Sequence, residues 1–375
     1  MKKIAFCLVL VLLTGLFAGC AGTPVVYYTN CTCPVAESGE TAVPAAPAAP
    51  ADTTPEVKPT EAEKVDVPVA DGELKTGLAV VCSTGKSVSA TADAAGAAEF
   101  DVTVVAVLVD ENGVIVDCLL DSIGTSVKFD AKGQLTEVPE GIKTKNELGP
   151  DYNMKTYGGA IAEWDQQAAA VAAYAVGKTA DELMNGAVNE SGYAADADLA
   201  SSATIYIGGY VNAIVKAVET AEYRDAQGAD KLVFAAMPKA ASSASATAEK
   251  AGTAQLDVDV VAMTLNGETI TSCVIDSLQG KVSFDTNGAI TTDLTAPVQT
   301  KNELGENYNM KTYGGAIAEW DVQTASFCQY VTGKTVAEVG GIAVDAGTKP
   351  TGEDLNTSVT IAIGGFQALI AKAAQ

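Results

Sequence analysis

An internal duplication constrains the fold of this chain more than any other feature of its sequence. The block YNMKTYGGAIAEWD occurs at 152–165 and, letter for letter, at 308–321. KNELG precedes both copies and GKT follows both, which gives a repeat period of about 156 residues. Such a period is too long for the unit of a solenoid. We therefore expect two similar domains, at 72–222 and 223–375, and we expect each of them to fold alone.

The first part of each repeat is typical of β-strands. Residues 99–109 alternate and then run apolar, with many β-branched side chains, which favours a strand. The turn signal Glu-Asn-Gly follows at 111–113, and 114–120 is interpreted as the returning strand of a hairpin. A further short strand is expected at 126–129.

The second part of each repeat changes to helical patterns. Residues 160–176 are rich in alanine, and a last helix is expected at 209–220. Thr179 and Glu182 have the spacing of a capping box, which opens a helix, and the residues at 335–338 repeat it. Strands followed by helices indicate an α+β fold, in which helices cover one face of a small antiparallel sheet.

The N-terminus has the features of a lipoprotein signal. Lys2 and Lys3 precede an apolar run at 4–17, which is shorter than the roughly 20 residues that span a bilayer and has the length of a signal-peptide core. The run ends in Leu-Phe-Ala-Gly-Cys and resembles a bacterial lipobox, with Cys20 as the lipidated residue. We expect 1–19 to be removed and acyl chains such as palmitate to hold the protein on the extracytoplasmic face of the cell membrane. An ordinary secretory signal is the alternative.

Residues 20–71 are expected to form a lipidated, disordered tether. From about residue 34 onward proline, alanine and acidic residues dominate, and such a segment buries too little apolar area to offset its chain entropy. Cys31 and Cys33 form a C-x-C in this tether. A local disulfide or free thiols are expected there, with a metal role as the alternative.

Charge and composition exclude several classes of protein. The formal net charge is -24, which argues against nucleic acid, whose phosphates would be repelled, and against a polybasic membrane contact. The chain has no histidine, which excludes Ser-His-Asp and Cys-His hydrolases and argues against haem.

The cysteines of the two repeats are expected to be structural. Cys118 and Cys273 occupy equivalent positions in strand-like segments and are interpreted as small buried residues. Cys82 and Cys328 have no counterparts in the other repeat. None of these spacings is typical of a metal site.

A short polar motif, D-x-x-[ST]-x-x-T, occurs at the same place in both repeats, just before an apolar segment that contains Gly-Gly. A serine- and threonine-rich motif before a helix is also typical of an N-cap, which is the alternative interpretation. The matched positions are Asp198, Ser201 and Thr204 in the first repeat and Asp354, Thr357 and Thr360 in the second.

This motif resembles that of the FMN-binding domain family, in which a flavin transferase joins FMN through a phosphoester to the last residue of D-x-x-[ST]-G-A-[ST]. The resemblance implies that Thr204 and Thr360 are the two attachment points. The sequence departs from the family pattern at the glycine, which is Ser202 in one copy and Ser358 in the other. The alanine is kept in the first copy and is Val359 in the second.

The YNMKTYGGAIAEWD block, with KNELG before it, resembles a subgroup of flavin-bearing lipoproteins of Gram-positive bacteria that serve extracellular electron transfer. This resemblance implies two covalent FMN groups and maturation by a flavin transferase. It also implies a membrane NADH- or quinone-linked electron donor and an extracellular electron acceptor.

Aromatic residues and glycines of the two blocks are candidates for flavin contact. Glycine allows close approach of a flat ring, and aromatic rings stack on one. A tryptophan at helical spacing is equally compatible with a place in the core. The candidates are Tyr157, Gly158, Gly159 and Trp164, with Tyr313, Gly314, Gly315 and Trp320.

The function expected from the sequence is that of a membrane-anchored, extracytoplasmic electron carrier. Such a protein tethers and orients its cofactor and needs no catalytic side chain of its own. The alternatives are a non-redox lipoprotein that binds a small ligand, and a structural or adhesive surface protein with the repeats as spacers.

Overall fold

The computed structural model describes residues 72–375, which belong to one compact unit. The predicted signal peptide at 1–19, the tether at 20–71 and the lipidation residue Cys20 lie outside the described residues. No helix within 72–375 has the length and hydropathy that crossing a membrane would require.

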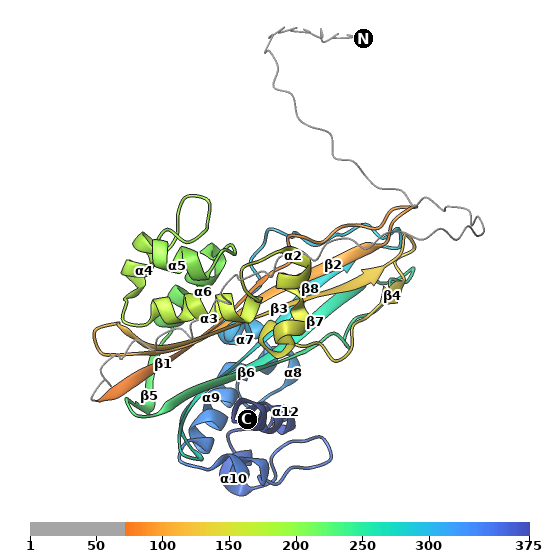
Figure 1. The fold of residues 1–375 in the computed structure, drawn as a ribbon. Coiled ribbons are helices and arrows are strands. Elements are labelled where there is room, and N and C mark those ends of the chain that lie inside the picture. Colours follow the sequence, from red (N-terminus) through yellow and green to blue (C-terminus); the bar gives the residue numbers. More distant parts are fainter. Residues whose placement is uncertain (1–71) are drawn as a thin grey trace, which may run out of the picture. The chain divides into compact units, whose positions relative to one another are not determined.

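The first repeat, together with the segment that follows it, forms an antiparallel sheet with the order β4-β3-β2-β1-β5 (Figure 1). The expected boundary at 222/223 therefore falls at the start of β5, which pairs with β1 of the first repeat. The expected strand at 99–109 lies within β2, and the two strands expected at 114–120 and 126–129 are parts of one continuous strand, β3. Neither β1 nor β5 was predicted from the sequence. The strands are β1 (Glu73–Ser83), β2 (Gly96–Val109), β3 (Ile115–Phe129), β4 (Leu135–Glu137) and β5 (Glu222–Gln227).

The second repeat forms a three-stranded antiparallel sheet with the order β6-β7-β8. Its strands are β6 (Lys231–Lys239), β7 (Gly252–Asn266) and β8 (Thr269–Phe284), and they correspond to β1, β2 and β3. The long β2–β3 and β7–β8 hairpins each contain one register shift near the turn. The duplicated sequence therefore gives a duplicated meander.

The helices also repeat in order. In the first repeat they are α1 (Lys145–Leu148), η1 (Gly149–Tyr152), α2 (Met154–Gly158), α3 (Trp164–Ala175), α4 (Ala180–Gly186), α5 (Ala197–Ser202) and α6 (Gly208–Glu219). In the second they are α7 (Lys301–Leu304), η2 (Gly305–Tyr308), α8 (Met310–Gly314), α9 (Trp320–Val331), α10 (Val336–Gly340), α11 (Glu353–Asn356) and α12 (Gly364–Ala373).

Capping boxes begin several of these helices. Both predicted boxes are confirmed, because Thr179 and Thr335 each accept a hydrogen bond from the backbone of the glutamate three residues later. Thr144 and Thr300 form two further boxes at the start of α1 and α7. Each box satisfies two backbone groups that a helix N-terminus leaves without partners.

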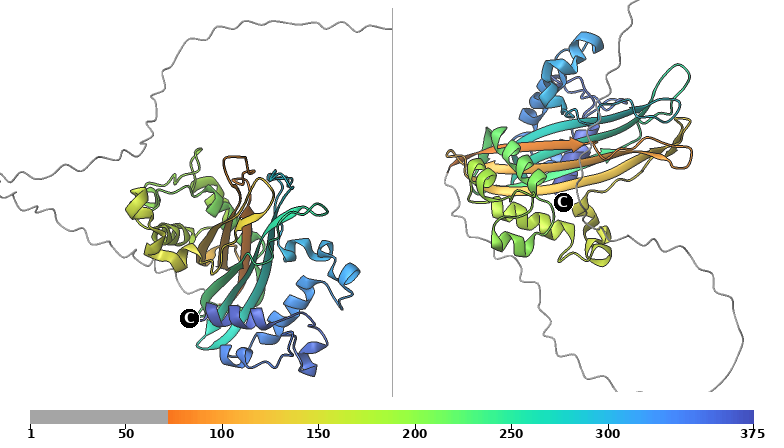
Figure 2. Two further views of the ribbon diagram at one scale, coloured as in Figure 1. Left: turned by 90° about the vertical axis from the view of Figure 1, so that its right-hand side faces the viewer. Right: turned by 90° about the horizontal axis from the view of Figure 1, so that it is seen from above.

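The two sheets stack face to face, and the helices of each repeat cover the outer face of its own sheet (Figure 2). Side chains alternate accordingly along β2: Val104 packs between the sheets, whereas Val105 packs against the helices. Between the sheets the rings of Phe129 and Phe284 stack with centroids 4.0 Å apart. Each sheet is thus buried on both faces.

The α+β class and the covering of each sheet by helices are confirmed, whereas the division into two tandem domains is not. The core between the sheets contains residues of both repeats, Leu78 and Val258 among them. A repeat on its own would expose this apolar face to water. The stacking therefore argues against the expectation that each half folds alone.

Candidate functional site

Thr204 lies on the surface, in the short connection between α5 and α6. Its backbone N–H and its hydroxyl both donate to Oε1 of Gln167, at 2.8 and 3.2 Å. Gln167 is fully buried on α3, and its Nε2 donates to the carbonyl of Ala162 at 2.9 Å. One buried amide therefore joins the candidate attachment residue to the repeated block.

The second repeat builds the same contacts at Thr360. Its N–H and hydroxyl donate to Oε1 of Gln323 at 2.8 and 3.1 Å, and Gln323 donates to the carbonyl of Ala318 at 2.8 Å. Thr360 is half-buried, whereas Thr204 is exposed. The two threonines thus have matching local environments, although the motif around them differs in sequence.

The N-cap alternative does not describe either threonine. Helix α6 begins at Gly208, its N-cap is Ile207, and no side chain caps it. Helix α12 begins in the same way after Ile363. Since Thr204 and Thr360 each precede these helices by several residues, their hydroxyls do not satisfy helix N–H groups.

Within the repeated block, a glutamate holds the segment before the tyrosine. Glu163 accepts hydrogen bonds from the N–H groups of Met154 and Lys155, at 2.8 and 3.2 Å. Glu319 accepts the equivalent pair, from Met310 and Lys311, at 2.8 and 3.0 Å. These carboxylates satisfy the first N–H groups of α2 and α8 and so fix the loop that carries the tyrosine and the glycine pair.

The tyrosines of the block are open to solvent. Tyr157 is 86% exposed and Tyr313 is 87% exposed. The glycines that follow are also exposed, and Gly159 and Gly315 have positive φ angles of 63° and 62° that favour glycine. Because these residues are exposed, core packing does not account for their being identical in the two repeats.

The tryptophans lie in the core instead. Trp164 is 2% exposed and donates its indole N–H to the hydroxyl of Tyr210 at 3.1 Å. Trp320 is 5% exposed and packs edge-on against Phe366. Their packing corresponds to the core interpretation, and neither tryptophan presents an open ring face to a ligand.

The acidic residue of each motif is exposed, and its contacts differ between the two repeats. Asp196, which lies outside the motif, caps α5, and Ser201 donates its hydroxyl to the carbonyl of Asp198 at 2.7 Å. Asp354 accepts a hydrogen bond from the hydroxyl of Tyr330 at 2.9 Å, which raises the pKa of that tyrosine. Thr357 is exposed at the end of α11.

Each repeat has a surface cavity close to the helix that follows or precedes the motif, but only that of the second repeat is lined by the acidic residue of the motif. In the first, about 340 Å³ lies beside Tyr206, Gly208 and Gly192 at the start of α6. In the second, about 330 Å³ lies beside Tyr330 and Asp354. Neither cavity contains a group of metal ligands, and no cluster of three such side chains occurs among the described residues.

Two of the residues that organise the site were missed in the sequence: Gln167 and Glu163, with their counterparts Gln323 and Glu319. A signal for the glutamine was present, because it follows the identical block by two residues in both copies while the residue before it differs. No family model, curated protein or solved structure matches this chain.

Proposed function

We propose that the chain is a lipid-anchored, extracytoplasmic electron carrier with FMN joined through a phosphoester to Thr204 and to Thr360. The observation that carries the proposal is the pair of matching environments. Each threonine hydroxyl lies at the surface or near it, is held by a buried glutamine and does not cap a helix. A site kept in both repeats at an accessible hydroxyl supports modification better than it supports packing.

The glutamine is suited to orient the hydroxyl but not to activate it. An amide oxygen accepts the hydroxyl proton in a hydrogen bond, yet it is far too weak a base to remove it. In the transfer, the threonine oxygen would form a bond to the FMN phosphorus and the other half of a flavin dinucleotide would leave. The base that takes the threonine proton must therefore come from the transferase.

The helix starts that follow the threonines and the exposed tyrosines of the repeated block have properties that suit the phosphate and the ring. The first turns of α6 and α12 have no side-chain cap, and the N–H groups of such a turn favour an anion. Tyr157 and Tyr313 offer free ring faces for stacking. When bound, the flavin supplies the redox chemistry, and the protein supplies attachment and orientation.

The two sites would act separately. Their helical layers lie on opposite faces of the stacked sheets (Figure 2), and stacked sheets are themselves about 10 Å apart. Each flavin would thus exchange electrons with its own approaching partner at its own side of the molecule. For the same reason, loss of one site should not disturb loading of the other.

Intact mass spectrometry tests the proposal directly. Protein co-expressed with a flavin transferase in an exporting host should stay yellow after denaturation and carry two additions, each equal to FMN less one water. Thr204→Ala should remove one addition and Thr360→Ala the other, whereas Thr204→Ser keeps an oxygen nucleophile and at least partial loading. Ser202→Ala and Ser358→Ala, at neighbouring hydroxyls in the position where the family motif has glycine, are the matched controls and should leave both additions in place.

Two outcomes would contradict the proposal. A colourless wild-type protein under these conditions would favour the non-redox ligand-binding lipoprotein. Two additions that survive in the Thr204→Ala, Thr360→Ala double variant would place the attachment at other residues.

A further inference from the structure

We propose that Cys273 and Cys328 form a thiol–disulfide redox site in the second repeat. This inference does not rest on the proposed flavin attachment, because the residues and the chemistry are different. It rests on a pair of neighbouring thiols and on a cavity that reaches one of them.

The two cysteines meet where a helix packs on a sheet. Cys273 lies on β8 with its side chain on the helix-covered face, and Cys328 lies on α9, the helix that packs there. Both are buried, both are free thiols, and their side chains are hydrogen-bonded to each other. A disulfide between these two cysteines would link α9 to β8 covalently and would need no third cysteine.

The first repeat supplies an internal comparison. Cys118 on β3 is the counterpart of Cys273, and it is buried in the equivalent core. The counterpart of Cys328 on α3 is Ala172, which packs in the same cluster. The duplicated fold therefore needs no thiol at the helix position, and the pair is a property of the second repeat.

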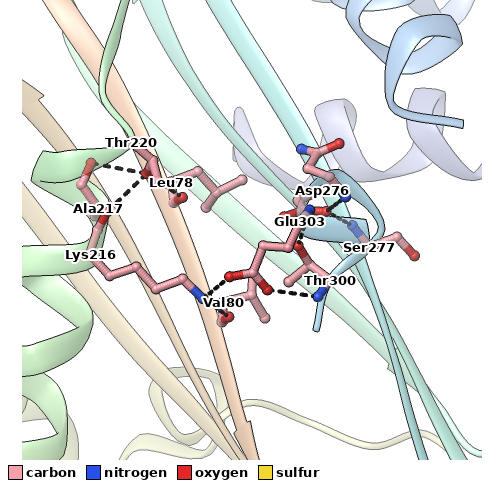
Figure 3. Close-up of polar contacts among 10 residues, drawn as sticks. Leu78, Val80, Lys216, Ala217, Thr220, Asp276, Ser277, Thr300 and Glu303 are labelled. Atoms are coloured by element: carbon pink, nitrogen blue, oxygen red, sulfur yellow. Dashed lines mark hydrogen bonds and ion pairs between the residues drawn. The ribbon is translucent and has the colours of Figure 1, made fainter. Parts of the chain in front are cut away.

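A cavity of about 410 Å³ between the two repeats gives access to Cys328. Its wall includes Arg224 of β5 and Asp276 of β8. The ion pair of Lys216 with Glu303 lines the same cavity (Figure 3). Because Cys328 lines this cavity, a small polar oxidant that enters it would lie next to that residue.

Arg224 is placed to assist the reaction. Its Nη2 forms an ion pair with Glu222 at 2.7 Å, but its buried Nε–H has no hydrogen-bond partner. The hydrogen bond to Cys328 and burial hold the pKa of Cys273 well above its usual value, and the positive charge of Arg224 offsets part of that rise. The arginine therefore increases the small fraction of Cys273 thiolate, the nucleophile of the second exchange step, relative to a site without it.

The oxidant is a small-molecule disulfide, and the step balances as an exchange. The Cys328 sulfur attacks the disulfide, forms a mixed disulfide and releases one small thiol. The Cys273 sulfur then attacks the Cys328 sulfur and releases the second small thiol. Two electrons and two protons pass from the protein to the oxidant, and an excess of small thiol reverses both steps.

Non-reducing peptide mapping of the full chain tests the site, with oxidised glutathione as the probe. Tryptic cleavage after lysine separates the described cysteines into different peptides: 76–86, 87–128, 251–281 and 312–334. We expect a linked peptide that joins 251–281 to 312–334, with loss of two alkylatable thiols, and recovery of both after dithiothreitol. Cys118 should remain alkylatable in the same sample.

Variants separate the site from general oxidation. Cys328→Ala should abolish the linked peptide. Arg224→Gln should slow its formation several-fold, whereas Arg224→Lys should restore most of the rate because the positive charge is kept. Full alkylation of Cys273 and Cys328 in the oxidised wild-type protein, or a link from either of them to Cys82, would overturn the proposal.

Discussion

Lys216 of α6 forms an ion pair with Glu303 of α7, with Nζ and Oε1 2.6 Å apart, and so joins the first repeat to the second (Figure 3). The equivalent pair occurs with the repeats exchanged: Lys372 of the second repeat pairs with Glu147 of the first, at 2.7 Å. Each lysine also donates to a backbone carbonyl of the first strand of its own repeat. The two repeats are thus related by an approximate two-fold arrangement, in which each repeat contributes one lysine and one glutamate to the two ion pairs.

The glutamates of these pairs have two roles, which leads to a first prediction. Glu303 also accepts the N–H of Thr300 in the capping box of α7, at 2.8 Å. Lys216→Met should therefore lower the free energy of unfolding by up to about 1 kcal/mol, as partly exposed ion pairs do. Glu303→Ala should cost about 1 kcal/mol more because the cap is also lost.

Urea unfolding at low ionic strength measures these differences. Lys372→Met is the matched variant and should behave as Lys216→Met does, with additive effects because the two pairs have no residue in common. The exposed pair Lys128–Glu137 within the first repeat is the control, and Lys128→Met should not change the midpoint measurably. Equal effects from Lys128→Met and Lys216→Met would contradict the part assigned to the inter-repeat pairs.

The stacked sheets lead to a second prediction. Residues 72–227 and 228–375, divided after β5 so that each sheet stays whole, should each expose, when expressed separately, the apolar face that the other covers. We expect each half alone to lack a cooperative thermal transition or to self-associate, and the mixed halves to form a one-to-one complex that melts cooperatively. Circular dichroism with size-exclusion chromatography measures both properties. Two monomeric halves with cooperative melts that do not bind each other would show that the shared core is dispensable.

A third prediction concerns pH and the buried carboxyl of Asp276. Burial raises the pKa of Asp276 to about 6. Hydrogen bonds from the Thr300 side chain and from the N–H groups of Asn302 and Ser277 act in the opposite direction, because they stabilise the charged carboxylate. The unfolded chain has the usual aspartate pKa near 4. Between these values the native state binds more protons, so stability should fall as pH rises from about 4 to about 6.

Removing this charge should stabilise the protein above that range. Two pKa units correspond to about 3 kcal/mol, an upper figure for the gain on Asp276→Asn at neutral pH. The asparagine keeps an oxygen that can accept the two backbone N–H groups. The unfolding free energy of Asp276→Asn, measured from pH 4 to pH 8, should show a smaller downward slope than that of the wild type. A slope identical to that of the wild type would place the titration elsewhere.

The sequence was informative about local structure and less so about how the sheets pack. The capping boxes at Thr179 and Thr335 and the hairpin after β2 were predicted because their signals are local. The apolar run at the end of β2 is buried on both faces, as expected for a sheet that has helices on one face and a second sheet on the other. That covering depends on the partner sheet, which the local pattern does not identify.

The candidate site shows the same limit. The motif placed Thr204 and Thr360 between two helices, and the structure has them there. Whether Trp164 would face a ligand or the core, and which residue would hold the threonine, depends on how α3 packs on the sheet. Gln167 is therefore the residue whose role only the tertiary structure could supply.

The last prediction tests that role, and it requires a wild-type protein that loads two flavins. Gln167→Leu removes the acceptor of the Thr204 N–H and hydroxyl while keeping a buried side chain of similar size. We expect FMN occupancy at Thr204 to fall several-fold and occupancy at Thr360 to stay unchanged, because Gln323 is intact. Gln323→Leu should have the reciprocal effect. Peptide-level mass spectrometry measures each occupancy, and a circular dichroism melt checks the fold. Equal losses at both threonines from one substitution would indicate a general folding defect and would remove the glutamine from the proposed positioning role.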